Sequence, residues 1–212
     1  MGKVYLSPSM QHANACAFGD SEKDHCNKVM DIVEVHLKRC GISFKRNKTL
    51  TNLTDITTDS NAYGADLHFA LHTNAVGGTK AGSVRGHHVY YYPTSDNGKK
   101  LAQLLVKNFK SIYNVTDAQH EAIGNNVYTE LKKTKAVAVI EETVFHDNKK
   151  DAEWYHNSYV KIAEYVARTI CEYLNVKYVE EPTTRSFEEL FNTACSKIAD
   201  IPEVKELMKL VK

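Results

Sequence analysis

The chain has 212 residues, of which 42% are hydrophobic and 25% are charged, and its formal net charge is +1. This length is enough for one well-buried core and a short additional piece. The composition is that of an ordinary globular protein, which argues against a fibrous or disordered chain. The near-neutral charge gives no general electrostatic basis for binding nucleic acid or an anionic membrane, and we expect neither as a partner.

The cysteines and the N-terminus bear on the compartment in which the protein is made. The five cysteines form no C-x-x-C pair, which argues against a disulfide framework or a cysteine zinc site. The first residues lead directly into a strand without the apolar stretch of a secretion signal, and no run approaches the ~18 apolar residues of a membrane span. We therefore expect synthesis in a cytoplasm, with reduced thiols and no membrane insertion. The cysteines are Cys16, Cys26, Cys40, Cys171 and Cys195.

The first third of the chain alternates between strand and helix signals. A strand precedes a helix whose N-cap is Ser21 and whose end is marked by Gly41, and Gly64 closes a second helix in the same way. The predicted elements are a strand at Val4–Leu6, a helix at Ser21–Cys40, a strand at Ile42–Arg46 and a helix at Thr51–Tyr63.

The same alternation continues to about residue 174. It predicts an α/β fold in which a twisted mixed β-sheet is flanked by helices on both faces. The expected elements are strands at Leu67–His72 and His87–Tyr92, a helix at Lys99–Tyr113, a loop at Asn114–Gly124, strands at Val127–Leu131 and Val137–Ile140, and a helix at Asp151–Leu174.

The character of the chain changes after Asn175. We expect a catalytic domain at residues 1–176, a linker at 177–185 and a short C-terminal helical tail at 186–212. A capping box at Ser186 opens a first tail helix that runs to about Ala199, and Pro202 precedes a second at Glu203–Leu210. The tail could dock on the core, mediate association, or begin a targeting domain, and the sequence leaves these alternatives and the oligomeric state open.

Two strand ends carry the chemistry of the chain. His72 lies at the end of the apolar strand that begins at Leu67, and a second segment ends in Glu141 and Glu142 after Val-Ala-Val-Ile. Each feature alone has an ordinary structural explanation, since strand ends often meet water. Together they suggest a metal-centred hydrolase, because ionisable groups beside a buried sheet usually have a partner or a task.

A hydrolytic zinc site needs two or three imidazole or carboxylate ligands and one open position for water. His72 is the first candidate ligand, Glu22 at the start of the first long helix is the second, and His12 in the loop after the first strand is the third. Glu142 is then the free carboxylate that moves protons. Four other histidines are rival ligands, and His146 is the first of them to test: His68, His87, His88 and His146.

From about Lys3 to Asn175 the chain resembles the zinc-dependent N-acetylmuramoyl-L-alanine amidases, which are cell-wall hydrolases of bacteria and of phage endolysins. It is similar to the branch whose first strand ends in Ser-Pro-Ser rather than Asp-Pro-Gly-His. Six segments carry the resemblance: Leu6-Ser-Pro-Ser-Met-Gln-His12, Ser21-Glu22, Arg46-Asn47, Asp66 through Ala75, Gly86-His-His-Val-Tyr-Tyr-Tyr, and Ala138-Val-Ile-Glu-Glu142-Thr-Val-Phe-His-Asp-Asn148.

The resemblance implies one zinc ion, held by His72, by Glu22 and by His12, with Gln11 as the alternative to His12. It implies that Glu142 is the catalytic glutamate and that bacterial peptidoglycan is the substrate, cleaved between N-acetylmuramic acid and L-alanine. An endolysin or autolysin made in the cytoplasm of a bacterial host would act at the cell wall after release. Candidate substrate contacts are Asn74, Lys80 and, as a secondary candidate, Glu141.

Two other functions stay open on the sequence. A zinc peptidase acting within the stem peptide would use the same metal chemistry, and a catalytically impaired wall-binding module would keep only the fold. A nucleotide-binding flavodoxin-like protein has little support, because no G-x-G-x-x-G or P-loop follows a predicted strand.

Overall fold

The computed structural model describes residues 2–16 and 19–181. Contacts divide the chain into Met1–Val179 and Glu180–Lys212. The two helices predicted in the tail lie outside the described residues and stay predictions. Among the helices that the structure does describe, none combines the length and the apolar character needed to cross a bilayer.

Six strands form one mixed sheet in the order β2-β1-β3-β6-β4-β5. The first four in that order are mutually parallel, whereas β4 runs antiparallel to β6 and β5 runs parallel to β4. This arrangement confirms the predicted mixed sheet. The strands are β1 (Lys3–Pro8), β2 (Ser43–Arg46), β3 (Leu67–Asn74), β4 (Gly86–Tyr91), β5 (Gln119–Gly124) and β6 (Val137–Phe145).

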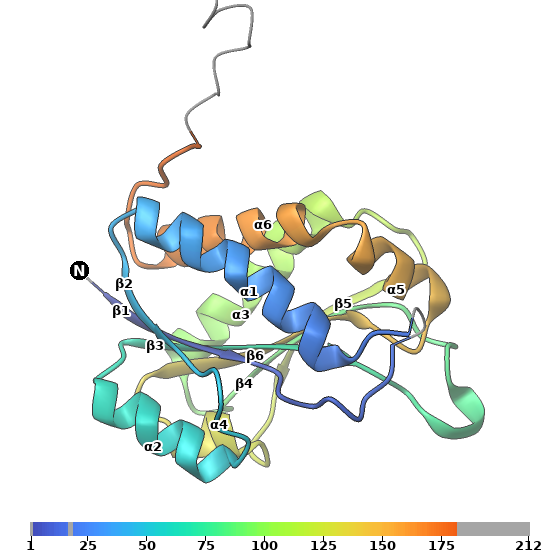
Figure 1. The fold of residues 1–212 in the computed structure, drawn as a ribbon, viewed down its shortest axis with the longest axis horizontal. Helices are drawn as coiled ribbons and strands as arrows, with labels where there is room; N and C mark the ends of the chain where they lie inside the picture. Colours follow the sequence, from blue (N-terminus) through green and yellow to red (C-terminus); the bar gives the residue numbers. More distant parts are fainter. Residues whose placement is uncertain (1, 17–18, 182–212) are drawn as a thin grey trace, which may run out of the picture. The chain divides into compact units, whose positions relative to one another are not determined.

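Helices cover both faces of the sheet, as the sequence predicted. Figure 1 shows α1, α3 and α6 on one side and α2 and α4 on the other. The helical elements are α1 (Glu22–Arg39), α2 (Leu53–Tyr63), the 3₁₀ turn η1 (Gly78–Lys80), α3 (Asp96–Ile112), α4 (Thr129–Lys133), α5 (Lys149–His156) and α6 (Tyr159–Tyr173).

The side chains of β3 alternate between the two layers because strand residues point to opposite faces in turn. Leu67, Phe69 and Leu71 join the main core, which α1, α3 and α6 complete. Ala70 instead belongs to a smaller apolar cluster with Leu131 of α4. His72 therefore falls on the face of α2 and α4, two residues beyond Ala70.

The start of α1 is held by a capping box. The Ser21 hydroxyl accepts a hydrogen bond from the Asp24 backbone, and the Asp24 side chain accepts one from the Ser21 backbone. This reciprocal pair satisfies two of the N–H groups that a helix start leaves free. The cap confirms the predicted helix start, and it fixes Glu22 as the first residue of the helix.

Three predicted elements are wrong. Val127–Leu131 is not a strand, because Asn125 Oδ1 accepts hydrogen bonds from two backbone N–H groups and turns the chain into α4. Asn114–Gly124 is not all loop, since its second half forms the edge strand β5. The helix at Asp151–Leu174 is interrupted, because Ser158 has φ −127°, outside the helical region, and separates α5 from α6.

Candidate metal centre

The adjoining strands β3 and β6 deliver the two central residues of the site. His72 and Glu142 are register partners, so their side chains lie beside each other on the face of α2 and α4. Directly after this pair β6 has one extra residue, because Asn74 pairs with Phe145. The N-terminus of α1 reaches the same ends of β3 and β6 and brings Glu22 into contact with His72.

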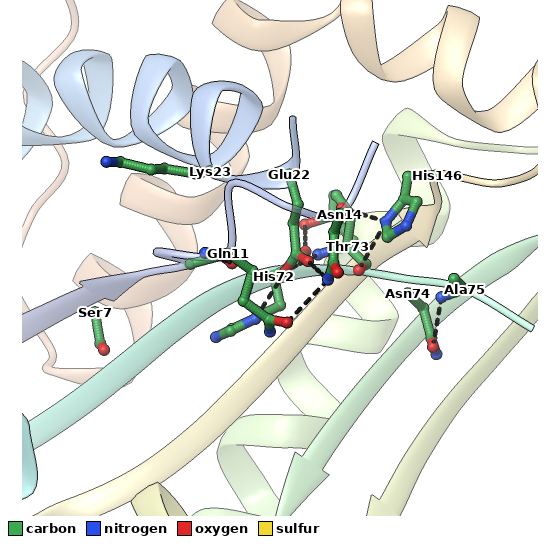
Figure 2. A network of polar contacts seen from close by, with 12 residues as sticks. Ser7, Gln11, Asn14, Glu22, Lys23, His72, Thr73, Asn74, Ala75 and His146 are labelled. Atoms are coloured by element: carbon green, nitrogen blue, oxygen red, sulfur yellow. Dashed lines mark hydrogen bonds and ion pairs between the residues drawn. The ribbon is translucent and has the colours of Figure 1, made fainter. Parts of the chain in front are cut away.

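Glu22 and His72 are in direct contact. His72 Nδ1 lies 2.8 Å from Glu22 Oε1, and the other carboxylate oxygen accepts a hydrogen bond of 2.6 Å from Asn14 Nδ2. The same Asn14 nitrogen also donates to Gln11 Oε1 at 2.9 Å. Figure 2 shows these four side chains gathered at the end of β3. The loop after β1 therefore contributes two amides to the surroundings of a carboxylate–imidazole pair.

Charges around His72 shift both partners of this pair. Burial works to lower the pKa of His72, but the hydrogen bond to Glu22 and the charge of Glu142 outweigh it and raise the pKa to about 9. Burial likewise works to raise the pKa of Glu22, and the hydrogen bond with His72 turns the net shift downward. The Glu22 carboxylate is therefore held ionised beside His72, and its negative charge favours a cation at this place once the imidazole is neutral.

Glu142 is the uncommitted carboxyl of the site. Burial raises its pKa to about 7, the charge of His72 works against this shift and the charge of Glu22 adds to it. Within the described part of the chain, Glu142 Oε2 has no hydrogen-bond partner. A carboxyl with a pKa near neutrality and a free oxygen has the properties of a general acid–base group.

Two adjoining hollows of about 330 Å³ and 260 Å³ open onto these side chains. They share Gln11, Leu53, His72 and Glu130, and the smaller one also contains Glu142. We call the two together the groove. The larger hollow of about 480 Å³ around Arg85 contains none of these residues. The groove is therefore where a substrate can reach the site.

A buried polar network lies beneath the groove. Glu130 Oε1 accepts hydrogen bonds from Ser7 Oγ at 2.5 Å and from His68 Nε2 at 3.0 Å, and Ser60 contacts the other nitrogen of His68. Sequence reasoning missed Glu130, which it placed on a strand. No local spacing connects it to Ser7, which is 123 residues away. Because its oxygen is engaged on both sides, Glu130 supports the floor of the groove.

The structure separates the other residues that the sequence proposed. His12 is exposed in the loop after β1. Within residues 2–16 and 19–181, the possible ligand atoms of His12, Glu22 and His72 do not all lie within 4.8 Å of one another. Asn74 is half-buried, and Lys80 is exposed at the end of η1. Glu141 has no exposed surface and pairs with His87 in the core. These contacts favour a structural role for Glu141.

Three of the four rival histidines have hydrogen-bond partners of their own, and His88 packs edge-on against Phe145. His146 Nδ1 lies 2.9 Å from the Thr73 hydroxyl, and His68 belongs to the Glu130 network. His87 Nε2 donates to Glu141 Oε1 at 3.0 Å on the opposite face of the sheet. Within the described residues, His72 is thus the histidine that contacts Glu22.

A carboxylate–imidazole pair and a free carboxyl at the ends of the central strands of an α/β sheet have the chemistry of a hydrolytic site. The model of the N-acetylmuramoyl-L-alanine amidase family matches residues 9–172, and the chain belongs to this family. The match spans every residue of the site from Ser9 onward. No curated protein matches the chain in sequence.

Solved structures have the same fold at low sequence identity. The amidase AmiC2 of Nostoc punctiforme is 21% identical with a TM-score of 0.72, covering 82% of this chain and 97% of its own. The catalytic domain of CwlV of Bacillus (Paenibacillus) polymyxa is 21% identical with a TM-score of 0.71, covering 84% and 100%. The catalytic domain of the CD27L endolysin targeting Clostridia difficile is 19% identical with a TM-score of 0.67, covering 85% and 100%.

Proposed function

We propose that the protein hydrolyses the amide bond between N-acetylmuramic acid and L-alanine in bacterial peptidoglycan, using a zinc ion held at Glu22 and His72. One observation carries the proposal: a Glu22–His72 pair lies beside an uncommitted Glu142 carboxyl at the wall of the groove. The family membership indicates the bond that is cleaved.

The donor set fits zinc. Imidazole nitrogen and carboxylate oxygen are ordinary zinc ligands with bonds of roughly 2.0–2.2 Å, so two ligand atoms on one tetrahedral ion are about 3.3 Å apart. The 2.8 Å between His72 Nδ1 and Glu22 Oε1 is close to this separation. A small opening of the pair would therefore admit the ion, and the Asn14 hydrogen bond would keep the Glu22 carboxylate oriented.

The loop after β1 supplies the third donor. Gln11 lines both hollows of the groove together with His72, and its amide is joined to Glu22 through Asn14. His12 is the neighbouring candidate, but it lines neither hollow. These contacts favour Gln11, whose amide oxygen is a weaker ligand for zinc than an imidazole. Replacing each residue with alanine and measuring zinc affinity distinguishes the two.

When bound, zinc supplies a water of lowered pKa and a positive charge that polarises the substrate carbonyl. Glu142 accepts the proton from the attacking water and delivers it to the nitrogen of the departing L-alanine. A pKa of about 7 suits both transfers, since the same group must take and give a proton near neutral pH. Asn74 and Lys80 are our candidates for contacts to the glycan or stem peptide.

The test is digestion of purified sacculi by the full chain, with mass spectrometry of the products. We expect free amino groups on L-alanine, intact glycan strands, loss of activity on chelation and recovery with zinc. His72→Ala should lose turnover, while Lys23→Ala, at a half-buried lysine next to Glu22 on α1, serves as the control. New termini within the stem peptide would indicate a peptidase instead, and wall binding without products would indicate a binding module.

The biological setting that fits this activity is wall lysis from within an infected or lysing cell. We infer an endolysin or autolysin role, which is supported by the fold shared with an endolysin catalytic domain. The test is complementation of a lysis-defective phage, in which the wild-type chain should restore lysis and the Glu142→Gln variant should not.

A further inference from the structure

A second cluster of possible metal ligands lies away from the groove. Asp20 immediately precedes the cap of α1, His25 lies in the first turns of α1, and His156 is the last residue of α5. One carboxylate oxygen and one ring nitrogen of each histidine lie within 4.8 Å of one another. In the part of the chain that the structure describes, no other set of His, Cys, Asp or Glu meets this criterion.

The environment of His25 is unusual for a core residue. Its ring is only 3% exposed and packs edge-on against Tyr155 at 5.7 Å between centroids. Its Nδ1 contacts the Tyr159 hydroxyl, and within the described residues its Nε2 has no hydrogen-bond partner. Buried polar nitrogens are normally paired, so the protein alone leaves this imidazole incompletely satisfied.

Tyr159 lies between the two histidines. Its hydroxyl contacts His25 Nδ1 and lies 3.3 Å from His156 Nδ1. Asp20 is the third member of the cluster and contributes its negative charge. In this structure Lys28 Nζ forms an ion pair with the Asp20 carboxylate at 2.9 Å. Lys28 is about half exposed, at 47%. It can therefore turn into solvent when a cation approaches the carboxylate.

We propose that Asp20, His25 and His156 form a structural site for a divalent cation of the zinc class, separate from the site at Glu22 and His72. Two imidazole nitrogens and one carboxylate oxygen are a zinc-type donor set. The fourth position is taken by water or by the Tyr159 hydroxyl. No residue is shared between the two sites.

The second ion braces the loop between β1 and α1. This loop is folded onto the helix start by hydrogen bonds from Cys16 N to Asp20 O at 2.8 Å and from Glu22 N to Asn14 O at 2.9 Å. An ion at Asp20 ties the end of the loop to α1 and α5. Asn14 in this loop donates a hydrogen bond to the Glu22 carboxylate. An ion that stabilises the loop therefore also stabilises the position of Glu22 at the groove.

The experiment is zinc titration of the chelator-stripped full chain by calorimetry, with metal content measured by mass spectrometry. We expect two zinc ions per chain in the wild type and one in His156→Asn or Asp20→Asn. His72→Ala should also bind one, and the double variant His72→Ala/His156→Asn none. The matched control is Glu153→Gln, an exposed carboxylate three residues before His156 on α5, which should keep both ions.

Lys28→Met gives a readout that does not depend on losing a ligand. Removing the competing ammonium should tighten the second site by at least threefold and leave the first unchanged. If His156→Asn and Asp20→Asn bind zinc with the wild-type stoichiometry and affinity, the second site is refuted. If His72→Ala keeps both ions while His156→Asn loses one, the second site stands and the catalytic assignment fails.

Discussion

Glu141 and Glu142 are neighbours in β6, yet they belong to different environments. Glu141 points into the layer of α3 and α6, where it has no exposed surface and accepts a hydrogen bond from His87. Glu142 points to the opposite face, beside His72 at the wall of the groove. The alternation of side chains along a strand separates them completely.

Burial alone does not distinguish these two carboxyls. Burial raises the pKa of Glu141 to about 8 and that of Glu142 to about 7, so both carboxyls are perturbed in the same direction. Burial also lowers the pKa of His87 to about 3, which leaves Glu141 and His87 as a neutral hydrogen-bonded pair at pH 7. Glu142 opens onto the groove and Glu141 does not, so access to the groove makes Glu142 the candidate for the reactive carboxyl.

The largest expected effect is at Glu142. Glu142→Gln removes the proton carrier and keeps the shape of the side chain, so the hydrolysis rate should fall by roughly 10²–10⁴-fold. Release of amino groups from sacculi measures the rate, and thermal unfolding should show no loss of stability. A variant that digests walls at the normal rate would contradict the role of Glu142.

The next effect concerns the amide that holds Glu22. Asn14→Ala removes the 2.6 Å hydrogen bond to Glu22 Oε2, and such supporting contacts typically change metal affinity by about 10–100-fold. Calorimetric zinc titration measures the loss. Asn27→Ala, at an amide on α1 that bonds to Ser9, Lys23 and Arg46 rather than to Glu22, is the matched control. Equal zinc affinities of Asn14→Ala and Asn27→Ala would show that Asn14 does not support Glu22 as a metal ligand.

On the opposite face, Glu141→Ala should affect folding rather than turnover. It leaves the buried Nε2 of His87 without its acceptor, which costs about 1–3 kcal/mol of unfolding free energy. Urea denaturation measures this cost, and activity per folded molecule should stay near that of the wild type. A large loss of turnover in folded Glu141→Ala would break the contrast between the two carboxyls.

The smallest effect is the pH dependence of stability. Folded Glu141 keeps its proton up to about pH 8, whereas the unfolded chain loses it above its ordinary pKa of 4.5. Raising the pH between these values therefore destabilises the fold, by at most about 1.4 kcal/mol per pH unit. Glu141→Gln cannot titrate, so between pH 6.5 and 8 its unfolding free energy should fall less steeply. Parallel curves for the two proteins would show that Glu141 is ionised in the fold.

Strong periodic patterns and caps made most of the fold predictable. The apolar alternation at Leu67–Leu71 and the cap at Ser21 define β3 and α1 correctly. Edge and packing effects caused the errors. β5 carries few apolar residues because it is an edge strand, and Val127 looks like a strand residue but is 77% exposed just before α4.

For the site, the sequence supplied the residues at strand and helix ends, His72, Glu22 and Glu142. The structure brings Glu22 and His72 together and places Glu142 beside them. Asn14 and Glu130 could not be predicted, because their partners depend on how a loop and a short helix fold back onto the sheet. Likewise, the group of Asp20, His25 and His156 joins residues more than 130 positions apart.

The extra residue of β6 lies beyond the His72–Glu142 pair, not before it. The paired positions from Leu67–Val137 to His72–Glu142 keep a single register, and the irregularity begins only afterwards. Segment 75–85 starts downstream of that break. We therefore expect that a change in its length by loop exchange leaves this register intact and keeps Glu142 on the face of the groove.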